Sequence, residues 1–224
     1  MTKKVIITGA SGMVGKGVLL ECLDHSEIDT VLALGRTPTG IKHSKLIELM
    51  VADFTDFTMV RDQLKGYDAC YFCLGVSAGG MKESDYKRIT YDYTLALGKT
   101  LFQFNPGMTF IYVSGQGTDS SEKGRMMWAR VKGKTENDLS ALGFNQAFMF
   151  RPGIIIPLRG IKSKTPGYQF FYTYLGWLFK LIKLVAPDSA NNTTQIGLAM
   201  INATLYGYDK KIIATKDINA LAEG

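Results

Sequence analysis

A glycine-rich turn near the start of the chain combines residue types that can bind phosphate. Residues 8–15 read Thr-Gly-Ala-Ser-Gly-Met-Val-Gly and separate a β-branched run from a helix-forming run. Gly9 permits a tight turn, Gly12 lets backbone approach a pyrophosphate without a Cβ in the way, and Gly15 allows close helix–strand packing. The free N–H groups at the start of the helix would face the phosphates. We therefore predict a dinucleotide site here rather than an ordinary loop.

The end of the second predicted strand indicates which dinucleotide binds. NAD-binding proteins usually carry an acid there, which bonds the ribose 2′-OH. This chain has Arg36 instead, and a guanidinium forms strong bidentate bonds with a phosphate such as the 2′-phosphate of NADP. Lys16 beside the turn is a weaker indication in the same direction. The pattern favours NADP over NAD, and the alternative is an Arg36 that simply faces solvent.

Alternating strands and helices must position these groups. Apolar and β-branched runs predict strands at 3–8, 30–34, 46–51, 69–73, 109–114 and 146–150, and helices at 14–23, 58–64, 85–104 and 125–141. This alternation is typical of parallel βαβ units with helices on both faces of the sheet. We expect an α/β fold of the Rossmann type, a doubly wound parallel sheet in a single domain of residues 1–224. Residues 157–224 are expected to form a small C-terminal helical region on the substrate side, or a lid, because ligands bind outside the carboxyl ends of the strands.

The composition limits the partners and the compartment. The formal net charge is +6 and the pI about 9.1, but the basic residues are scattered, which favours anionic small ligands over nucleic acid. The three cysteines show no disulfide framework, and the apolar run in the first eight residues is too short for a secretory signal. We expect a cytoplasmic protein that acts on a small molecule.

Cysteines and histidines offer little further chemistry. Cys70 and Cys73 have the C-x-x-C spacing, but both lie in a predicted strand, where residues three apart face opposite sides. A core role is favoured over a redox pair, which needs a thiol at a helix N-terminus. His25 and His43 stand in no ligand spacing, so no metal site is expected.

Several motifs together resemble a known family. In chain order they are the turn at 8–15, Gly35 with Arg36, Asp53, residues 73–75, Ser114, residues 131–133 and residues 151–153. The set is similar to the atypical or extended short-chain dehydrogenases/reductases, and most similar to the NmrA-like and Tat-interacting oxidoreductase-like branch, whose members are often labelled nucleoside-diphosphate-sugar epimerases. The resemblance covers about residues 3–156 and implies an NADP(H)-dependent oxidoreductase or epimerase-like protein.

The resemblance also implies a catalytic trio, from which this chain departs. Ser114 matches the serine that orients the substrate oxygen, and Lys132 matches the lysine that holds the nicotinamide ribose. Trp128 occupies the position of the tyrosine that transfers the proton. An indole N–H only donates a hydrogen bond, so Trp128 cannot serve as a general acid or base. Either Tyr91, Tyr93 or Tyr112 substitutes for the missing phenol, or the protein is a non-catalytic sensor or scaffold that binds NADP(H).

The predicted cofactor site gathers these residues. Asp53 would accept from the adenine amino group, with a turn or helix-cap role as an equal alternative, and Gly75 would let the backbone pass under the cofactor, as the resemblance implies. The whole set comprises Thr8, Gly9, Ser11, Gly12, Met13, Val14, Gly15, Arg36, Asp53, Phe54, Leu74, Gly75, Lys132 and Pro152.

An apolar stripe at 168–186 carries Lys180 and Lys183, which argues against a membrane-spanning helix. We rank a lid over the substrate or a homodimer face above contact with a membrane surface.

Overall fold

A parallel sheet forms the centre of the molecule. The computed structural model describes residues 1–161 and 189–224. Within them, seven parallel strands form one sheet in the order β3-β2-β1-β4-β5-β6-β9. The strands are β1 (Lys3–Thr8), β2 (Ile28–Gly35), β3 (Leu46–Met50), β4 (Ala69–Phe72), β5 (Thr109–Val113), β6 (Gln146–Arg151) and β9 (Ile212–Ala214). The chain starts at β1 in the middle of the sheet, runs outward to β3, and then returns to form β4 on the other side of β1. In such folds, dinucleotides bind in the crevice at this change of strand order.

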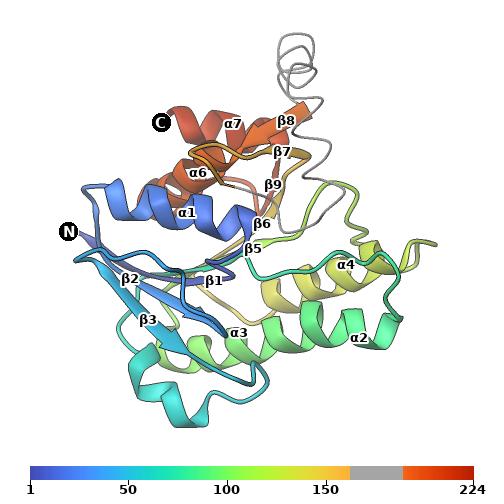
Figure 1. The fold of residues 1–224 in the computed structure, drawn as a ribbon. Helices are drawn as coiled ribbons and strands as arrows, with labels where there is room; N and C mark the ends of the chain where they lie inside the picture. Colours follow the sequence, from blue (N-terminus) through green and yellow to red (C-terminus); the bar gives the residue numbers. More distant parts are fainter. Residues whose placement is uncertain (162–188) are drawn as a thin grey trace.

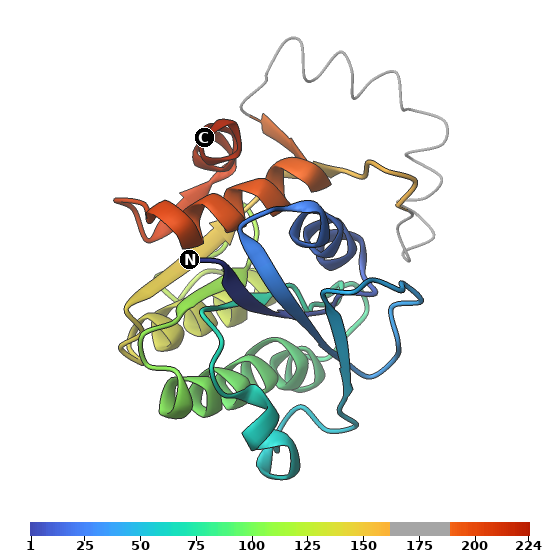
Figure 2. The same cartoon turned by 90° about the vertical axis from the view of Figure 1, so that its left-hand side faces the viewer.

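Helices cover both faces of this sheet (Figure 1). One layer holds α1 (Met13–Asp24), α6 (Thr193–Tyr206) and α7 (Thr215–Glu223); the other holds α2 (Glu83–Lys87), α3 (Tyr93–Phe104) and α4 (Met127–Ser140). Figure 2 shows the two layers on either side of the twisted strands. Because side chains alternate along a strand, Val5 and Ile7 pack under α1 while Ile6 packs into the opposite core. The Rossmann-type α/β fold expected from the sequence is confirmed.

Two predicted helices differ in detail. The expected helix 85–104 consists of α2 and α3 joined by one π-helical turn, η2 (Arg88–Asp92), and the segment η1 (Thr58–Leu64) winds as a 3-10 helix. A π-helical segment occurs mostly as a single turn inside an α-helix, and 3-10 turns often serve as connectors between elements.

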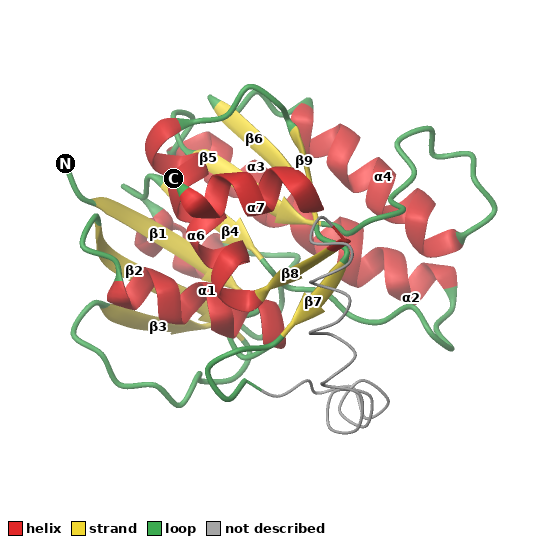
Figure 3. Ribbon diagram, turned by 90° about the horizontal axis from the view of Figure 1, so that it is seen from above, coloured by secondary structure: helices red, strands yellow, loops and turns green. Residues whose placement is uncertain are grey.

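The C-terminal third contributes more than a substrate-side lid. Seen from above, α6 and α7 lie on the same face as α1 (Figure 3). Glycine permits this close packing: a Cβ at Gly17 would lie 2.5 Å from the Cβ of Thr193, and one at Gly197 would lie 2.7 Å from the Cγ of Glu21. Strand β9 extends the main sheet beside β6, and β7 (Ile154–Ile156) pairs with β8 (Ala190–Asn192) in a separate small sheet. Residues 190–224 therefore complete the core. The predicted apolar stripe 168–186 lies outside the described residues.

No helix in residues 1–161 or 189–224 combines the length and the apolar character that crossing a bilayer requires.

Candidate functional site

The glycine-rich turn has the geometry that a phosphate-binding loop requires. Gly9 has φ +68°, and a Cβ there would lie 2.7 Å from the carbonyl oxygen of Cys73 at the end of the neighbouring strand. The amide of Gly12 donates to the carbonyl of Gly9 at 2.8 Å, which closes the turn. A Cβ at Gly15 would overlap the carbonyl of Gly9. Two of the three glycines are thus required by contacts within the protein.

The start of α1 faces this turn with its N–H groups available to an anion. Gly12 is the N-cap residue, no side chain caps the helix, and its first turn contains no acid. The positive end of the helix dipole therefore lies beside the turn without a local counter-charge. Thr8, at the end of β1, is buried and its hydroxyl accepts from the amide of Leu74 at 3.3 Å, which ties the turn to the loop after β4.

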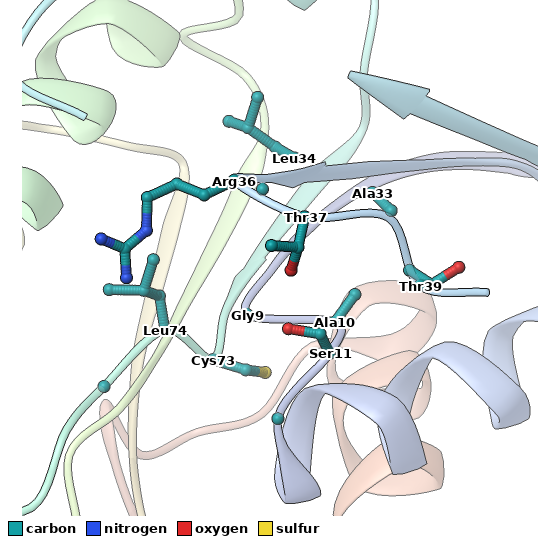
Figure 4. Close-up of a pocket in the computed structure, with 13 residues that line it drawn as sticks. Gly9, Ala10, Ser11, Ala33, Leu34, Arg36, Thr37, Thr39, Cys73 and Leu74 are labelled. Atoms are coloured by element: carbon teal, nitrogen blue, oxygen red, sulfur yellow. The ribbon is translucent and has the colours of Figure 1, made fainter. Parts of the chain in front are cut away.

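A pocket of about 560 Å³ opens between the turn and the ends of β2 and β4 (Figure 4). Six of the predicted cofactor residues line it: Gly9, Ser11, Gly12, Arg36, Leu74 and Gly75. The lining residues outside the predicted cofactor set are Ala10, Ala33, Leu34, Gly35, Thr37, Thr39 and Cys73. Alternation along β2 and adjacency to Arg36 could have pointed to Leu34, Gly35 and Thr37.

The pocket carries one charge. Arg36 is exposed at the end of β2, and Figure 4 shows its side chain extending past Leu74. None of the pocket's described lining residues is acidic, and no carboxylate of the described chain forms an ion pair with Arg36. A free guanidinium in an acid-free pocket suits an anionic ligand.

Asp53 and Phe54 are placed differently from the prediction. Asp53 is exposed, and its Oδ1 accepts from both the amide and the hydroxyl of Thr55 at 2.8 Å. These two hydrogen bonds lower the pKa of Asp53. Phe54 is fully buried against Phe57 and Tyr93. Neither lines the pocket, so the structure corresponds to the turn role for Asp53 and a core role for Phe54.

The carboxyl ends of β5 and β6 bring a second group of predicted residues together. Lys132 on α4 donates from its Nζ to the backbone carbonyl of Ser114, and Pro152 O accepts from the amide of Gln116 at 2.9 Å. The Ser114 side chain, however, is 3% exposed and donates to Glu136 Oε1 at 2.5 Å. Its hydroxyl is directed at a buried carboxylate, whereas the resemblance implied a contact with the substrate oxygen.

The surroundings of Lys132 lower its pKa. Burial lowers its pKa from 10.5 to about 8, and Glu136 partly opposes the shift. The amine of Lys132, at the carboxyl end of the sheet, therefore changes its protonation state near pH 8. Lys132 and Pro152 lie beyond the lining of the 560 Å³ pocket, as do Met13, Val14 and the buried Gly15, which form the first turn of α1.

Trp128 stands one helical turn before Lys132 on α4 and is half-buried. The three tyrosines considered as substitute acids are engaged elsewhere. Tyr91 donates to Asp138 at 2.5 Å, Tyr112 is fully buried and bonded to Thr135, and the Tyr93 ring packs against Phe54. Burial raises the pKa of Tyr112, and the bond to Asp138 raises that of Tyr91. Neither Tyr91 nor Tyr112 is therefore suited to release a proton near neutral pH.

The cysteines and histidines form no reactive site. Cys70 and Cys73 are free thiols, and they pack into opposite cores. Burial raises the pKa of both, that of Cys73 to about 12. Among the residues that the structure describes, no three His, Cys, Asp or Glu side chains cluster as metal ligands would.

The fold and the glycine turn define a Rossmann-type protein of the short-chain dehydrogenase/reductase and epimerase kind. Residues 5–119, about half of the chain, match the NAD dependent epimerase/dehydratase family. The chain belongs to this family, and the resemblance inferred from its motifs is confirmed.

Named relatives fall in the expected branch. Protein HTATIP2 of Rattus norvegicus is 28% identical over 178 residues, which cover 79% of this chain and 72% of the relative. The mitochondrial protein fmp52 of Emericella nidulans is 26% identical over 219 residues, which cover 94% and 91%.

Solved structures share the fold at low identity. A UDP-N-acetylglucosamine 4-epimerase from Methanobrevibacter ruminantium M1 superposes with a TM-score of 0.70 at 15% identity, over 94% of this chain and 75% of the other. The Bordetella bronchiseptica enzyme WbmF in complex with NAD+ gives 0.68 at 12% identity, over 99% and 78%.

The expected cytoplasmic location is contradicted by these relatives. Three fungal relatives, from Scheffersomyces stipitis, Emericella nidulans and Debaryomyces hansenii, are named as mitochondrial proteins. The free cysteines are compatible with either compartment, because a reducing environment is not unique to the cytoplasm.

Proposed function

We propose that this protein binds NADP(H) in preference to NAD(H). The supporting observation is Arg36: it lines the acid-free pocket at the end of β2 and has no carboxylate partner among the described residues. A 2′-phosphate would supply the missing counter-charge, whereas a 2′-hydroxyl would not.

The residues present fit such a cofactor. The pyrophosphate would lie at the uncapped start of α1, where Gly12 leaves room for it. Arg36 would hold the 2′-phosphate, and Lys132 would contact the nicotinamide ribose. The bound cofactor would supply hydride transfer, while this chain binds and orients it.

Calorimetry tests the cofactor preference. Wild-type protein should bind NADPH about 10 to 100 times more tightly than NADH, since a charge-assisted bond to phosphate contributes about 1.5–3 kcal/mol. Arg36→Asp should remove or reverse that preference. Arg61→Asp, which changes the same charge at an exposed site on η1, should leave it unchanged. Tighter binding of NADH by the wild type would contradict the proposal.

A second candidate function is a cofactor-binding sensor or scaffold without catalysis. It is favoured by Trp128 at the tyrosine position and by the engagement of Tyr91 and Tyr112 in other contacts. The leading candidate remains an oxidoreductase or epimerase-like enzyme whose proton transfer is impaired or uses another group. Both candidate functions require NADP(H) binding, so a measurement of turnover is needed to distinguish them.

A further inference from the structure

A buried carboxylate joins the elements around Lys132. Glu136 lies on α4, one turn after Lys132, and is 2% exposed. Its Oε1 accepts from the Ser114 hydroxyl at 2.5 Å and from Arg151 Nε at 3.0 Å, and its Oε2 pairs with the second guanidinium nitrogen of Arg151. Arg151 also donates to the Ser120 hydroxyl at 2.6 Å. One carboxylate thus ties α4 to the ends of β5 and β6 and, through Arg151, to the loop between β5 and α4.

The same network reaches the lysine ammonium. Ser114, whose side chain is held by Glu136, presents its backbone carbonyl to Lys132 Nζ. The ammonium has three donors, so this bond fixes its position and leaves the others for a ligand. The Glu136 charge counteracts the burial of the ammonium. If Ser114 serves to position Lys132, the inward direction of its hydroxyl is explained.

We propose that Glu136 is a positioning residue for the cofactor site: through Ser114 and through its own charge it holds Lys132 in place as an ammonium that can contact the cofactor. This inference rests on the proposed NADP(H) function. Glu136 is not among the residues that line the pocket, and its hydrogen bonds go to Ser114 and Arg151. It therefore acts on the cofactor site through Lys132.

Three other titratable groups lie on the elements around this ammonium. From β6, Arg151 brings a positive charge that is compensated by Glu136. From β5, Tyr112 faces the same helix with its hydroxyl on Thr135 and its pKa raised by burial. From α2, the buried Tyr86 lies near Tyr112. Neither tyrosine ionises near pH 8, so Glu136 supplies the negative charge that faces Lys132 among the described residues.

The test compares Glu136→Gln with Asp138→Asn across a range of pH. Glutamine keeps an acceptor for Ser114 but removes the charge, and Asp138 is a control on the same helix whose partners are Tyr91 and Lys134. Two readouts are followed from pH 6 to pH 10: the Kd for NADPH, and the rate at which acetic anhydride acetylates Lys132, measured by peptide mass spectrometry. Only the neutral amine reacts, so the second readout reports the charge of Lys132 without any cofactor.

In the wild type, NADPH affinity should fall and acetylation should rise with midpoints near pH 8. In Glu136→Gln both midpoints should move down by about one pH unit, because the charge that favours the ammonium is gone. Asp138→Asn should keep the wild-type midpoints. If Glu136→Gln does not fold because Arg151 is left unpaired, the double variant Glu136→Gln/Arg151→Gln should show a smaller shift in the same direction.

The outcomes separate the two proposals. A folded variant that lacks the Glu136 charge and keeps both wild-type midpoints would overturn the role of Glu136 while NADPH binding stands. A wild type that binds no NADPH would overturn the proposed function, and with it the coupling to cofactor affinity, whatever the acetylation rates show.

Discussion

The indole of Trp128 packs against the backbone at Gly117. A Cβ at Gly117 would lie 3.2 Å from Cη2 of Trp128, and Gly117 adopts φ +87°. A side chain at position 117 would therefore both strain the backbone and displace the ring. The loop after β5 and the start of α4 fix each other at this point, so Trp128 is an integral part of the packing.

The absence of a side chain at Gly12 should be required for binding of the dinucleotide. Gly12→Val should reduce NADPH affinity by about tenfold or more, because a branched side chain would occupy the space left for the pyrophosphate. The fold should persist, since Gly12 has φ −86°, which other residues adopt, although its Cβ would lie 3.2 Å from Gly9 O. Calorimetry measures the affinity and circular dichroism the fold.

Gly107→Val is the matched control, because a Cβ at Gly107 meets nothing within 4 Å. It should bind NADPH as the wild type does. A folded Gly12→Val protein with unchanged affinity would place the dinucleotide elsewhere.

The cysteines should be unreactive in the native protein. Burial raises the pKa values of Cys22, Cys70 and Cys73, the last to about 12, so the thiolate fraction at pH 8 is very small. We expect slow labelling by a disulfide reagent at pH 8 and rapid labelling of three thiols in guanidinium. Formation of a Cys70–Cys73 disulfide in the folded protein under mild oxidation would show that the packing into opposite cores is wrong.

Lys132 should destabilise the fold near neutral pH. Its pKa is about 8 in the folded protein and 10.5 ordinarily, so between these values the unfolded chain binds more protons. The stability contributed at this position is therefore lowest below pH 8 and rises as pH increases toward 10.5. Lys132→Met, which cannot ionise, should have a higher Tm than the wild type at pH 7, and the difference should shrink by pH 10.

Differential scanning calorimetry of both proteins measures this Tm difference. The titration of the groups that the two proteins share affects both equally and cancels in the difference. A Tm difference that is constant from pH 7 to pH 10 would show that Lys132 keeps its ordinary pKa. The same substitution should weaken NADPH binding, because the ribose contact proposed for Lys132 is lost.

Local patterns allowed six of the seven strands of the main sheet and six of the thirteen residues that line the pocket to be predicted. This was possible because the turn between β1 and α1 depends on residues adjacent in sequence. The direction of the Ser114 hydroxyl could not be predicted in this way. It is determined by Glu136, 22 residues later, and by its pairing with Arg151. Strand β9 was missed because Ile212–Ala214 is too short to show a periodic pattern and forms only beside β6.

Trp128 gives the prediction that separates the two candidate functions. A proton-transfer step by a tyrosine beside a lysine typically accelerates a reaction by about 100-fold or more, and Trp128 cannot supply it. The wild type should therefore bind NADPH firmly but oxidise it slowly or not at all with small carbonyl compounds or sugar nucleotides. Trp128→Tyr should raise the rate with at least one of these compounds, because the new phenol lies one turn before Lys132, whose charge favours the phenolate.

A spectrophotometric screen of NADPH oxidation, with Trp128→Phe as the control that lacks a hydroxyl, measures this effect. Trp128→Phe should stay at the wild-type rate, since neither side chain transfers a proton, and Lys132→Ala should weaken cofactor binding in either background. Brisk turnover by the wild type that survives in Trp128→Phe would overturn the loss of proton transfer. If that turnover then fell on substituting Tyr91, Tyr93 or Tyr112, the affected tyrosine would be the acid, and its hydroxyl would have to leave the contact that holds it here, as Tyr91 would have to leave Asp138.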